Sequence, residues 1–496
     1  MTDKSTNNQI PVQNLDENDL PSVSRRSFFK RTALAGVGVM AVGAGTLAAS
    51  KSSLQGRPTT GIETSPDFKP KDQRDVLLTY AASPKLSQDV FPERNEQYSK
   101  LHKKDFDFNR DVQNFEHRVP WNNEKEGYTQ MDKALMHASW FPLMVSKSRA
   151  QAFAQPNTPM HAWDQSDIES EVYDFGSNKR AATVMKSAAK VFGAVRCGIT
   201  PFDERFVYEP MYDIIHEQEL SWEKDFPFKP KSVIVLMTPM DYDCYATAPA
   251  WTVEGATGNG YVDMSKMACQ MAKFIRGMGY NAVGAGNDLG NSVAFAIQAG
   301  LGEGGRNSTC IAPGVGPRVR ICKIFTSIDF GDAYDVPHTW GITEFCKSCG
   351  KCAEACPAEA IPLPTDKDGG YGFKPTYEFA DEPGYTWNNH VGIKKFYSDA
   401  KKCFNFWIEN DSSCGNCVSS CTFNEPDFWH HWFIMAINPA MPGFIHSAMA
   451  SAHPAFGYGG QSGTPVPGKV EKFWQSGEGM RVNDSMRNNI GAVGKA

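Results

Sequence analysis

The chain has 496 residues, of which 41% are hydrophobic and 12% aromatic, so it can bury the cores of two or three packed units. Its formal net charge is −6, from 50 basic and 56 acidic residues, and no block of like charge dominates. This pattern excludes the basic footprint of a nucleic-acid-binding protein, and we expect no nucleic-acid partner.

The first fifty residues are typical of an export signal. Two adjacent arginines, Arg25 and Arg26, are followed by Ser27-Phe28-Phe29-Lys30 and by an apolar stretch of small residues at 33–49. This order predicts a twin-arginine signal peptide over residues 1–50, which the twin-arginine translocase would read. A membrane anchor is the alternative, but the apolar stretch is shorter than the roughly 20 residues that span a bilayer. We therefore expect an exported protein.

The middle of the chain changes character near residue 180. Residues 51–178, the predicted N-terminal unit, are polar and rich in proline and show no catalytic spacing. Apolar residues then recur at helical spacing over 181–192, and 233–237 predicts a buried strand. We predict an α/β core, or α+β in the wider sense, over residues 179–338, with an insertion near 209–230.

A second helix and a glycine-rich turn follow in the same core. Apolar residues at 267–278 predict a helix, and a short strand is predicted around 281–283. The glycines of 284–290 resemble a dinucleotide-binding loop only weakly, since the third glycine comes one residue late. We expect instead a turn at Gly284 and Gly286 that lets the backbone approach a large flat ligand.

Eight of the 13 cysteines fall in two tight groups between positions 346 and 421. The odd total and this crowding favour metal ligands over a framework of disulfides. The first group reads Cys346-x2-Cys349-x2-Cys352-x3-Cys356-Pro357, the ligand run of bacterial ferredoxins. In that run, three cysteines bind one [4Fe-4S] cluster and the fourth binds a second cluster. One cluster therefore implies another.

The second group, Cys403-x10-Cys414-x2-Cys417-x3-Cys421, keeps four ligands although Thr422 replaces the usual proline. We predict two [4Fe-4S] clusters with crossed ligands, in a ferredoxin-like domain over 339–426. The first cluster takes Cys346, Cys349, Cys352 and Cys421, and the second takes Cys356, Cys403, Cys414 and Cys417. Structural zinc is the alternative, which the lack of paired CxxC hairpins disfavours. The remaining cysteines are expected to be buried core thiols: Cys197, Cys244, Cys269, Cys310 and Cys322.

Further motifs accompany the cysteine groups. They are Phe274-Ile275-Arg276-x-Met278-Gly279-Tyr280, Gly316-Pro317-Arg318-Val319-Arg320 and Gly341-Ile342-Thr343-Glu344-Phe345. Together with the signal peptide, these motifs resemble the catalytic subunits of bacterial respiratory reductive dehalogenases over residues 181–426. The resemblance implies a nitroreductase-like core that binds a corrinoid, next to a bacterial 2[4Fe-4S] ferredoxin-like domain. It also implies that Gly284, Gly286 and Gly316 contact the corrinoid.

The implied reaction replaces a carbon-bound halogen by hydrogen, using two electrons and one proton and releasing halide. The corrinoid would be a cobamide in its base-off form. In agreement, the chain contains no Asp-x-His-x-x-Gly motif that could supply a histidine to cobalt. Cobalt without a strong lower ligand is more easily reduced to cobalt(I). The chain would thus be an oxidoreductase, the terminal reductase of organohalide respiration.

Alignment with the family's motifs places its catalytic positions on Tyr261, Asn287 and Arg320. Tyr261 would donate the proton to carbon after the halide leaves, and Arg320, which is permanently charged, would stabilise the phenolate. Asn287 would hydrogen-bond the phenol or orient the substrate. Taken singly, Tyr261 would be a packing residue and Arg320 a surface charge or a contact to the corrinoid tail.

The resemblance also implies partners. The substrate would be a small organohalide, which the sequence does not identify further. A small integral-membrane subunit would hold the enzyme at the outer, periplasmic face of the cytoplasmic membrane, where a quinol- or hydrogenase-linked donor supplies electrons. The sequence leaves open whether two copies pair as a homodimer. Residues 427–496 form a predicted C-terminal unit.

Two alternative functions remain open at this point. Epoxyqueuosine reductases are similar in combining cobalamin with two ferredoxin-type clusters, but they act on tRNA in the cytoplasm, whereas the signal peptide predicts export. The other alternative is an exported electron-transfer subunit with a ferredoxin domain and no corrinoid. The corrinoid content of the purified protein separates this last alternative from a reductive dehalogenase.

Overall fold

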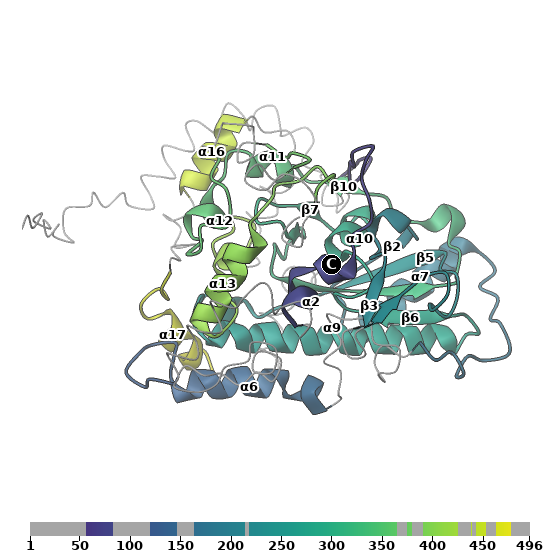
Figure 1. Ribbon diagram of the computed structural model, residues 1–496, viewed down its shortest axis with the longest axis horizontal. Coiled ribbons are helices and arrows are strands. Elements are labelled where there is room, and N and C mark those ends of the chain that lie inside the picture. Colours follow the sequence, from purple (N-terminus) through teal and green to yellow (C-terminus); the bar gives the residue numbers. More distant parts are fainter. Residues whose placement is uncertain are drawn as a thin grey trace, which may run out of the picture. The chain divides into compact units, whose positions relative to one another are not determined.

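The computed structural model describes residues 56–82, 120–145, 163–213, 218–364, 374–378, 390–424, 438, 443–452 and 463–477. These residues belong to one compact unit that starts at Leu54 (Figure 1). The predicted signal peptide lies outside the described residues, as does most of the predicted C-terminal unit. No helix in the described part combines the length and the apolar character of a membrane span. The domain boundaries predicted within the unit stay predictions.

A four-stranded antiparallel sheet forms the centre of the unit, in the order β2-β5-β9-β6. Its strands are β2 (Arg196–Pro201), β5 (Ser232–Pro239), β9 (Val319–Thr326) and β6 (Ala282–Ala285). The register sets Leu236 of β5 opposite Cys197 of β2 and Cys322 of β9. The two strands predicted from the sequence, at 233–237 and around 281–283, are therefore confirmed.

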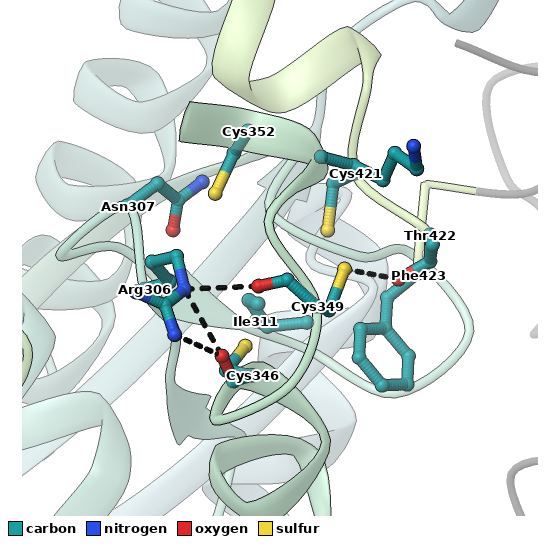
Figure 2. Close-up of a pocket in the computed structure, with 10 residues that line it drawn as sticks. Arg306, Asn307, Ile311, Cys346, Cys349, Cys352, Cys421, Thr422 and Phe423 are labelled. Carbon is teal, nitrogen blue, oxygen red and sulfur yellow. Dashed lines mark hydrogen bonds between the residues drawn. The ribbon is translucent and has the colours of Figure 1, made fainter. Parts of the chain in front are cut away.

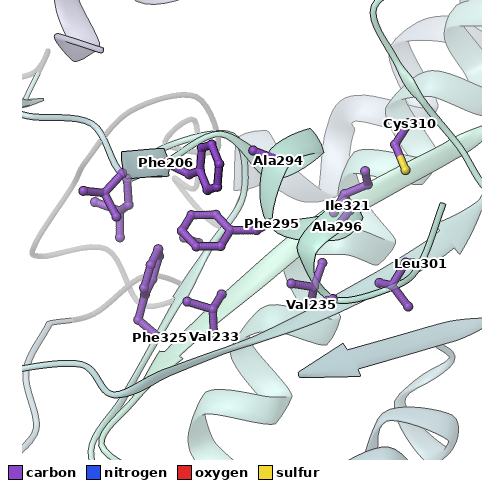
Figure 3. Packing of buried hydrophobic residues seen from close by; sticks show 14 of the residues in the cluster. Phe206, Val233, Val235, Ala294, Phe295, Ala296, Leu301, Cys310, Ile321 and Phe325 are labelled. Atoms are coloured by element: carbon purple, nitrogen blue, oxygen red, sulfur yellow. The ribbon is translucent and has the colours of Figure 1, made fainter. Parts of the chain in front are cut away.

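Both faces of β5 are covered, which explains why its sequence is apolar without interruption. Successive side chains of a strand point to opposite faces. Val235 lies in a cluster with Phe295 of α10 (Ser292–Gln298) and with Phe325 (Figure 3). The ring centres of Phe295 and Phe325 are 5.9 Å apart. Leu236 lies in a second cluster, formed with helices α7 and α9. The sheet is thus the middle of three layers.

The two helices of the second cluster are bounded by capping residues. In α7 (Asn178–Phe192), the side chain of Ser177 accepts a hydrogen bond from a backbone N–H of the first turn, and Gly193 ends the helix at a φ of 102°. Helix α9 (Thr252–Arg276) ends at Gly277, as predicted. The helix begins well before the predicted range of 267–278. The prediction missed its first half because glycines interrupt the apolar pattern there.

These glycines let helix α6 (Gln130–Val145) approach α9 closely, and Figure 1 shows the two side by side. A Cβ at Gly255 would lie 2.7 Å from Cγ of Leu135, and one at Gly258 would lie 2.8 Å from Cδ1 of Trp140. Each glycine costs a helix about 1 kcal/mol relative to alanine, which the packing of α6 offsets. Helix α6 belongs to the predicted N-terminal unit, so this unit helps to build the surroundings of α9.

Four short helices surround the cysteine groups: α11 (Ile342–Cys346), α12 (Lys351–Glu354), α13 (Ala400–Asn410) and α14 (Asn416–Ser419). A hairpin of the core, β7 (Glu303–Gly304) and β8 (Cys310–Ile311), contacts α11 through β7. The carboxylate of Glu303 accepts hydrogen bonds from the backbone N–H groups of Ile342, at 3.1 Å, and Thr343, at 3.3 Å. Core and cysteine region are therefore joined by buried polar contacts.

The remaining elements of the described residues are short. Strands β3 (Met211–Asp213) and β4 (Gln218–Leu220) pair inside the predicted insertion. The others are β1 (Arg57–Pro58), β10 (His338–Thr339), α2 (Leu77–Ala82), α8 (Tyr242–Tyr245), α16 (Gly443–Ala452), α17 (Lys469–Gln475), and single 3-10 turns at Gln73–Asp75, Glu204–Phe206 and Gly331–Ala333.

Candidate functional site

Three side chains predicted to be catalytic meet beside the sheet. Tyr261 comes from α9, Asn287 from the turn after β6, and Arg320 from β9. Asn287 Nδ2 donates a hydrogen bond to the phenol oxygen of Tyr261 at 3.0 Å. Arg320 Nη1 donates to the same oxygen at 3.4 Å, and the guanidinium carbon lies 4.3 Å from the centre of the Tyr261 ring. All three side chains remain partly exposed, so a ligand can reach them.

The charge of Arg320 is stabilised at this place. Burial by itself would lower the pKa of Arg320, but the phenols of Tyr261 and Tyr245 and the carboxylate of Glu254 raise that pKa above its ordinary value. In the described part of the chain, the buried Nε of Arg320 finds no hydrogen-bond partner. The site thus keeps a permanent cation against a phenol, with one N–H donor left for a ligand.

Trp140 of α6 covers Tyr261, a contact that the sequence did not predict. The two ring centres are 5.0 Å apart at an interplanar angle of 31°. Glu254 holds the indole in place, since its Oε1 accepts a hydrogen bond from Trp140 Nε1 at 2.8 Å. Its Oε2 accepts from the backbone N–H of Ser413 at 3.0 Å. The phenol ring therefore contacts both an indole and a guanidinium.

The turn that carries Asn287 is held by buried polar groups. Asp288 Oδ1 accepts a hydrogen bond from the N–H of Gly286 at 2.8 Å, and the carbonyl of Gly286 accepts from Lys323 Nζ. The same Nζ donates to Ser292 Oγ at 2.7 Å. Burial lowers the pKa of Lys323 to about 8. The available sequence signal for this network was a lysine among the apolar residues of the strand β9.

The three glycines predicted to contact a corrinoid have structural neighbours of their own. A Cβ at Gly284 would lie 2.9 Å from the carbonyl oxygen of Ala268 in α9, so glycine there permits close helix packing. Gly316 has a φ of +71°, and a Cβ there would lie 2.5 Å from the carbonyl oxygen of Phe423. Gly286 belongs to the turn of Asn287. Packing and turn geometry explain these glycines, and their contact with a corrinoid stays a prediction.

The structure brings the first predicted set of cysteines together. Cys346, Cys349, Cys352 and Cys421 line one pocket, with Arg306 among the other lining residues (Figure 2). Burial raises the pKa of the Cys352 thiol well above its ordinary value, and the neighbouring thiols raise it further. Four thiols in one dry pocket are a soft donor set, which suits an iron-sulfur cluster better than a hard cation.

The second predicted set also gathers. Burial raises the pKa of Cys403 well above its ordinary value, and the nearby thiols of Cys417, Cys414 and Cys356 add to this effect. Cys356 therefore lies near the other thiols of the second set, as crossed ligation would require, although it also packs against the hydrophobic cluster of Cys352. The side chains of this set are half-buried, whereas those of the first set are buried.

All 13 cysteines are free thiols. Among the described residues, no three or more His, Cys, Asp or Glu side chains are arranged to hold a single metal ion. A cubane cluster asks for a wider spacing, because each thiolate binds a different iron corner.

Of the cysteines expected to be core thiols, Cys244, Cys310 and Cys322 are buried. Cys197, on the outer strand β2, and Cys269, on helix α9, are only half-buried, which corrects the prediction.

Comparison with known proteins first defines the class. Residues 345–424 match the model of the 4Fe-4S dicluster domain. The chain is therefore an iron-sulfur protein whose dicluster domain follows a larger mixed core of helices and strands.

Over nearly two thirds of its length, the chain is similar to reductive dehalogenases. It is 34% identical over 367 residues to a tetrachloroethene reductive dehalogenase of Desulfitobacterium hafniense, which covers 65% of this chain and 64% of that protein. It is 31% identical over 334 residues to the tetrachloroethene reductive dehalogenase of Sulfurospirillum multivorans, covering 62% of each chain. The chain thus spans less than two thirds of the length of these curated relatives.

Solved structures confirm the predicted fold class. A catabolic reductive dehalogenase in complex with 3-bromo-4-hydroxybenzoic acid superimposes with a TM-score of 0.57 at 17% identity, covering 84% of this chain and 52% of that one. A reductive dehalogenase structure described as suggesting a mechanism for B12-dependent dehalogenation gives the same TM-score at 18% identity, over 84% and 50% of the two chains. By sequence and fold, the chain is a relative of the reductive dehalogenases, as its motifs predicted.

Proposed function

We propose that this chain is a reductive dehalogenase, which replaces a carbon-bound halogen of a small organohalide by hydrogen. One observation carries the proposal. A phenol, Tyr261, is held by an amide and a cation in a chain that also gathers eight thiols in two sets. Reductive dehalogenation consumes two electrons and one proton and releases halide. It therefore needs a proton donor, such as this phenol, and redox centres, which the two sets of thiols would bind.

The residues at Tyr261 fit a corrinoid as the second redox group. A corrinoid is rimmed by amides and carries a phosphate in its tail, and the free Nε of Arg320 is a donor for such oxygens. If bound there in the base-off form that we propose, this cofactor would supply the reducing power for cleavage of the carbon–halogen bond. Gly284, Gly286 and Gly316 are the proposed backbone contacts.

The side chains then complete the reaction. Tyr261 donates its phenolic proton to the substrate carbon as the halide leaves, and Arg320 stabilises the phenolate that results. Asn287 fixes the direction of the phenol through its 3.0 Å hydrogen bond. Trp140 covers the ring and narrows the access of water to it. The roles of Asn287 and Arg320 follow from their contacts to the phenol oxygen of Tyr261, and the role of Trp140 follows from its contact to the Tyr261 ring.

The proposal includes two [4Fe-4S] clusters with crossed ligands. The first is bound by Cys346, Cys349, Cys352 and Cys421, and the second by Cys356, Cys403, Cys414 and Cys417. Since the thiols of the second set are half-buried and those of the first set are buried, a cluster at the second set would be the more accessible to an electron donor, and one at the first set would lie deeper in the protein. Supporting this order, the first set of thiols shares its pocket with Arg306 and Asn307, which belong to the core.

The cellular setting is also part of the proposal. The paired arginines at 25–26 support export by the twin-arginine translocase. The mature enzyme would lie at the outer face of the cytoplasmic membrane, held by a small membrane subunit and supplied by a quinol- or hydrogenase-linked donor. The organohalides named for the relatives are the first substrates to assay.

The test is cofactor content combined with halide release. The purified protein should contain about eight irons, four for each cluster, and one cobalt. With a strong one-electron donor, it should release halide from tetrachloroethene or from another member of a panel of chlorinated alkenes, alkanes and halogenated aromatics. A protein with two clusters, no cobalt and no halide release would be an electron-transfer subunit, and the proposal would be wrong.

A further inference from the structure

Arg306 connects the core to the first set of thiols. It lies in the hairpin between β7 and β8, and its side chain is only 1% exposed. Its Nε donates hydrogen bonds to the carbonyl of Cys346 at 3.0 Å and to that of Cys349 at 2.9 Å (Figure 2). Nη1 donates to the carbonyl of Pro362 at 2.8 Å. The guanidinium thus ties together the loop that carries two of the four thiols.

The position of this cation is tightly defined. The ring of Phe396 lies 4.7 Å from the guanidinium carbon, and the Cys346 carbonyl also accepts from Nη2 at 2.6 Å. The nearby carboxylate of Glu303 is engaged by backbone N–H groups at the start of α11. Arg306 lines the same pocket as the four thiols. A full positive charge is therefore held in a dry place beside the cluster site.

Such a charge must act on the redox equilibrium of a cluster. Reduction adds one negative charge, and a nearby cation stabilises the more negative state. The effect is strong where water is excluded, because screening is weak there. An arginine keeps its charge at every accessible pH, so the effect does not depend on pH. The hydrogen bonds to the loop carbonyls also fix the distance between the charge and the cluster.

We propose that Arg306 raises the reduction potential of the cluster bound by Cys346, Cys349, Cys352 and Cys421 above the value that it would have without this charge. The inference rests on the cluster ligation proposed above. Arg306 belongs to the core and lies outside both cysteine motifs.

The test is a redox titration followed by electron paramagnetic resonance, on the purified holoprotein and two variants of Arg306. In Arg306→Gln, which removes the charge, the potential of one cluster should fall while that of the other stays at the parental value. In Arg306→Lys, which keeps the charge but loses the planar fork, the same potential should fall less. A parental potential for both clusters in Arg306→Gln would overturn the inference.

A matched control is Lys351→Gln. Lys351 lines the same pocket, but it forms an ion pair of 2.7 Å with Glu354 at the surface. Its removal should shift the potential less than Arg306→Gln does, and an equal shift would contradict a specific role for Arg306. If Arg306→Gln loses part of its iron, the potentials are measured on the molecules that retain both clusters: a fall for one cluster supports the inference, and parental values for both contradict it. Iron missing from the parent would instead disprove the cluster assignment.

Discussion

The amide of Asn287 donates a hydrogen bond of 3.0 Å to the phenol of Tyr261, a residue 26 positions away in the sequence. A neutral donor and the cation of Arg320 thus share one oxygen, on which negative charge would develop if the phenol gave up its proton. Donors placed in advance around such an oxygen stabilise the charge without the cost of reorganising solvent.

Tyr261→Phe should keep both clusters and the corrinoid and lose most turnover. The change removes only the phenolic oxygen, and proton transfer by a positioned acid contributes on the order of 10²–10⁴ to a rate. The measurement is halide release per cobalt. Tyr280→Phe is the control, because its hydroxyl bonds the carbonyl of Tyr173 at the surface and should leave the rate unchanged. Equal rates for the two variants would remove Tyr261 as proton donor.

The cysteine sites could be predicted from the sequence, and the phenol site could not without the family. Seven of the eight proposed thiol ligands lie in the runs Cys346–Cys356 and Cys414–Cys421, and only Cys403 lies outside them. Spacing alone therefore indicates a ferredoxin. Tyr261 and Arg320 are 59 residues apart and meet only because α9 crosses the sheet that contains β9. No local pattern records such a contact, and only the resemblance pointed to it.

The supporting residues were missed for a related physical reason. Arg306 acts on backbone carbonyls, which every residue has, so its partners leave no trace in the sequence. Glu254 lies in the glycine-rich half of α9, where the helical pattern is weak. Lys323 was the easiest of the three to suspect from the sequence, because a lysine among the apolar residues of a buried strand needs a polar partner.

Glu254→Gln should loosen Trp140 and so weaken substrate binding. The variant keeps the shape of the side chain but removes its charge, and hydrogen bonds to a charged group contribute about 1.5–3 kcal/mol. We expect KM to rise about tenfold and kcat to change less, since Tyr261 and Arg320 remain. Glu354→Gln, on the surface, is the control. A fall in kcat with KM unchanged would show instead that Glu254 acts on the proton transfer.

Cys356→Ala should damage the cluster whose other ligands follow residue 402. The thiol of Cys356 lies beside those of Cys403, Cys414 and Cys417, although it is close to Cys352 in sequence. In electron paramagnetic resonance of the reduced proteins, Cys356→Ala should therefore lose the signal of one cluster and Cys352→Ala that of the other. If both variants lose the same signal, the ligands are not crossed, and each cysteine group binds its own cluster.

His390 should make the fold sensitive to mild acid. Its ring stacks on Phe68 at 4.9 Å, and its Nε2 lies 2.8 Å from the carbonyl oxygen of Lys69. Burial lowers the pKa of His390 to about 3, and the charges of Lys71 and Lys395 act in the same direction. Below a pH of about 6.5, the unfolded chain binds a proton that the folded chain refuses.

The stability contributed by neutral His390 is therefore complete above pH 6.5 and is lost as the pH falls toward 3. Between pH 7 and 5, the loss amounts to about 2 kcal/mol. In His390→Phe, which keeps an aromatic ring for Phe68 but cannot bind the proton, the thermal unfolding midpoint should fall less between these two pH values than in the parent. The comparison uses the change with pH within each protein, because the lost contact to Lys69 lowers the midpoint of the variant at both. A variant with the full parental fall would mean that other groups cause the sensitivity to acid.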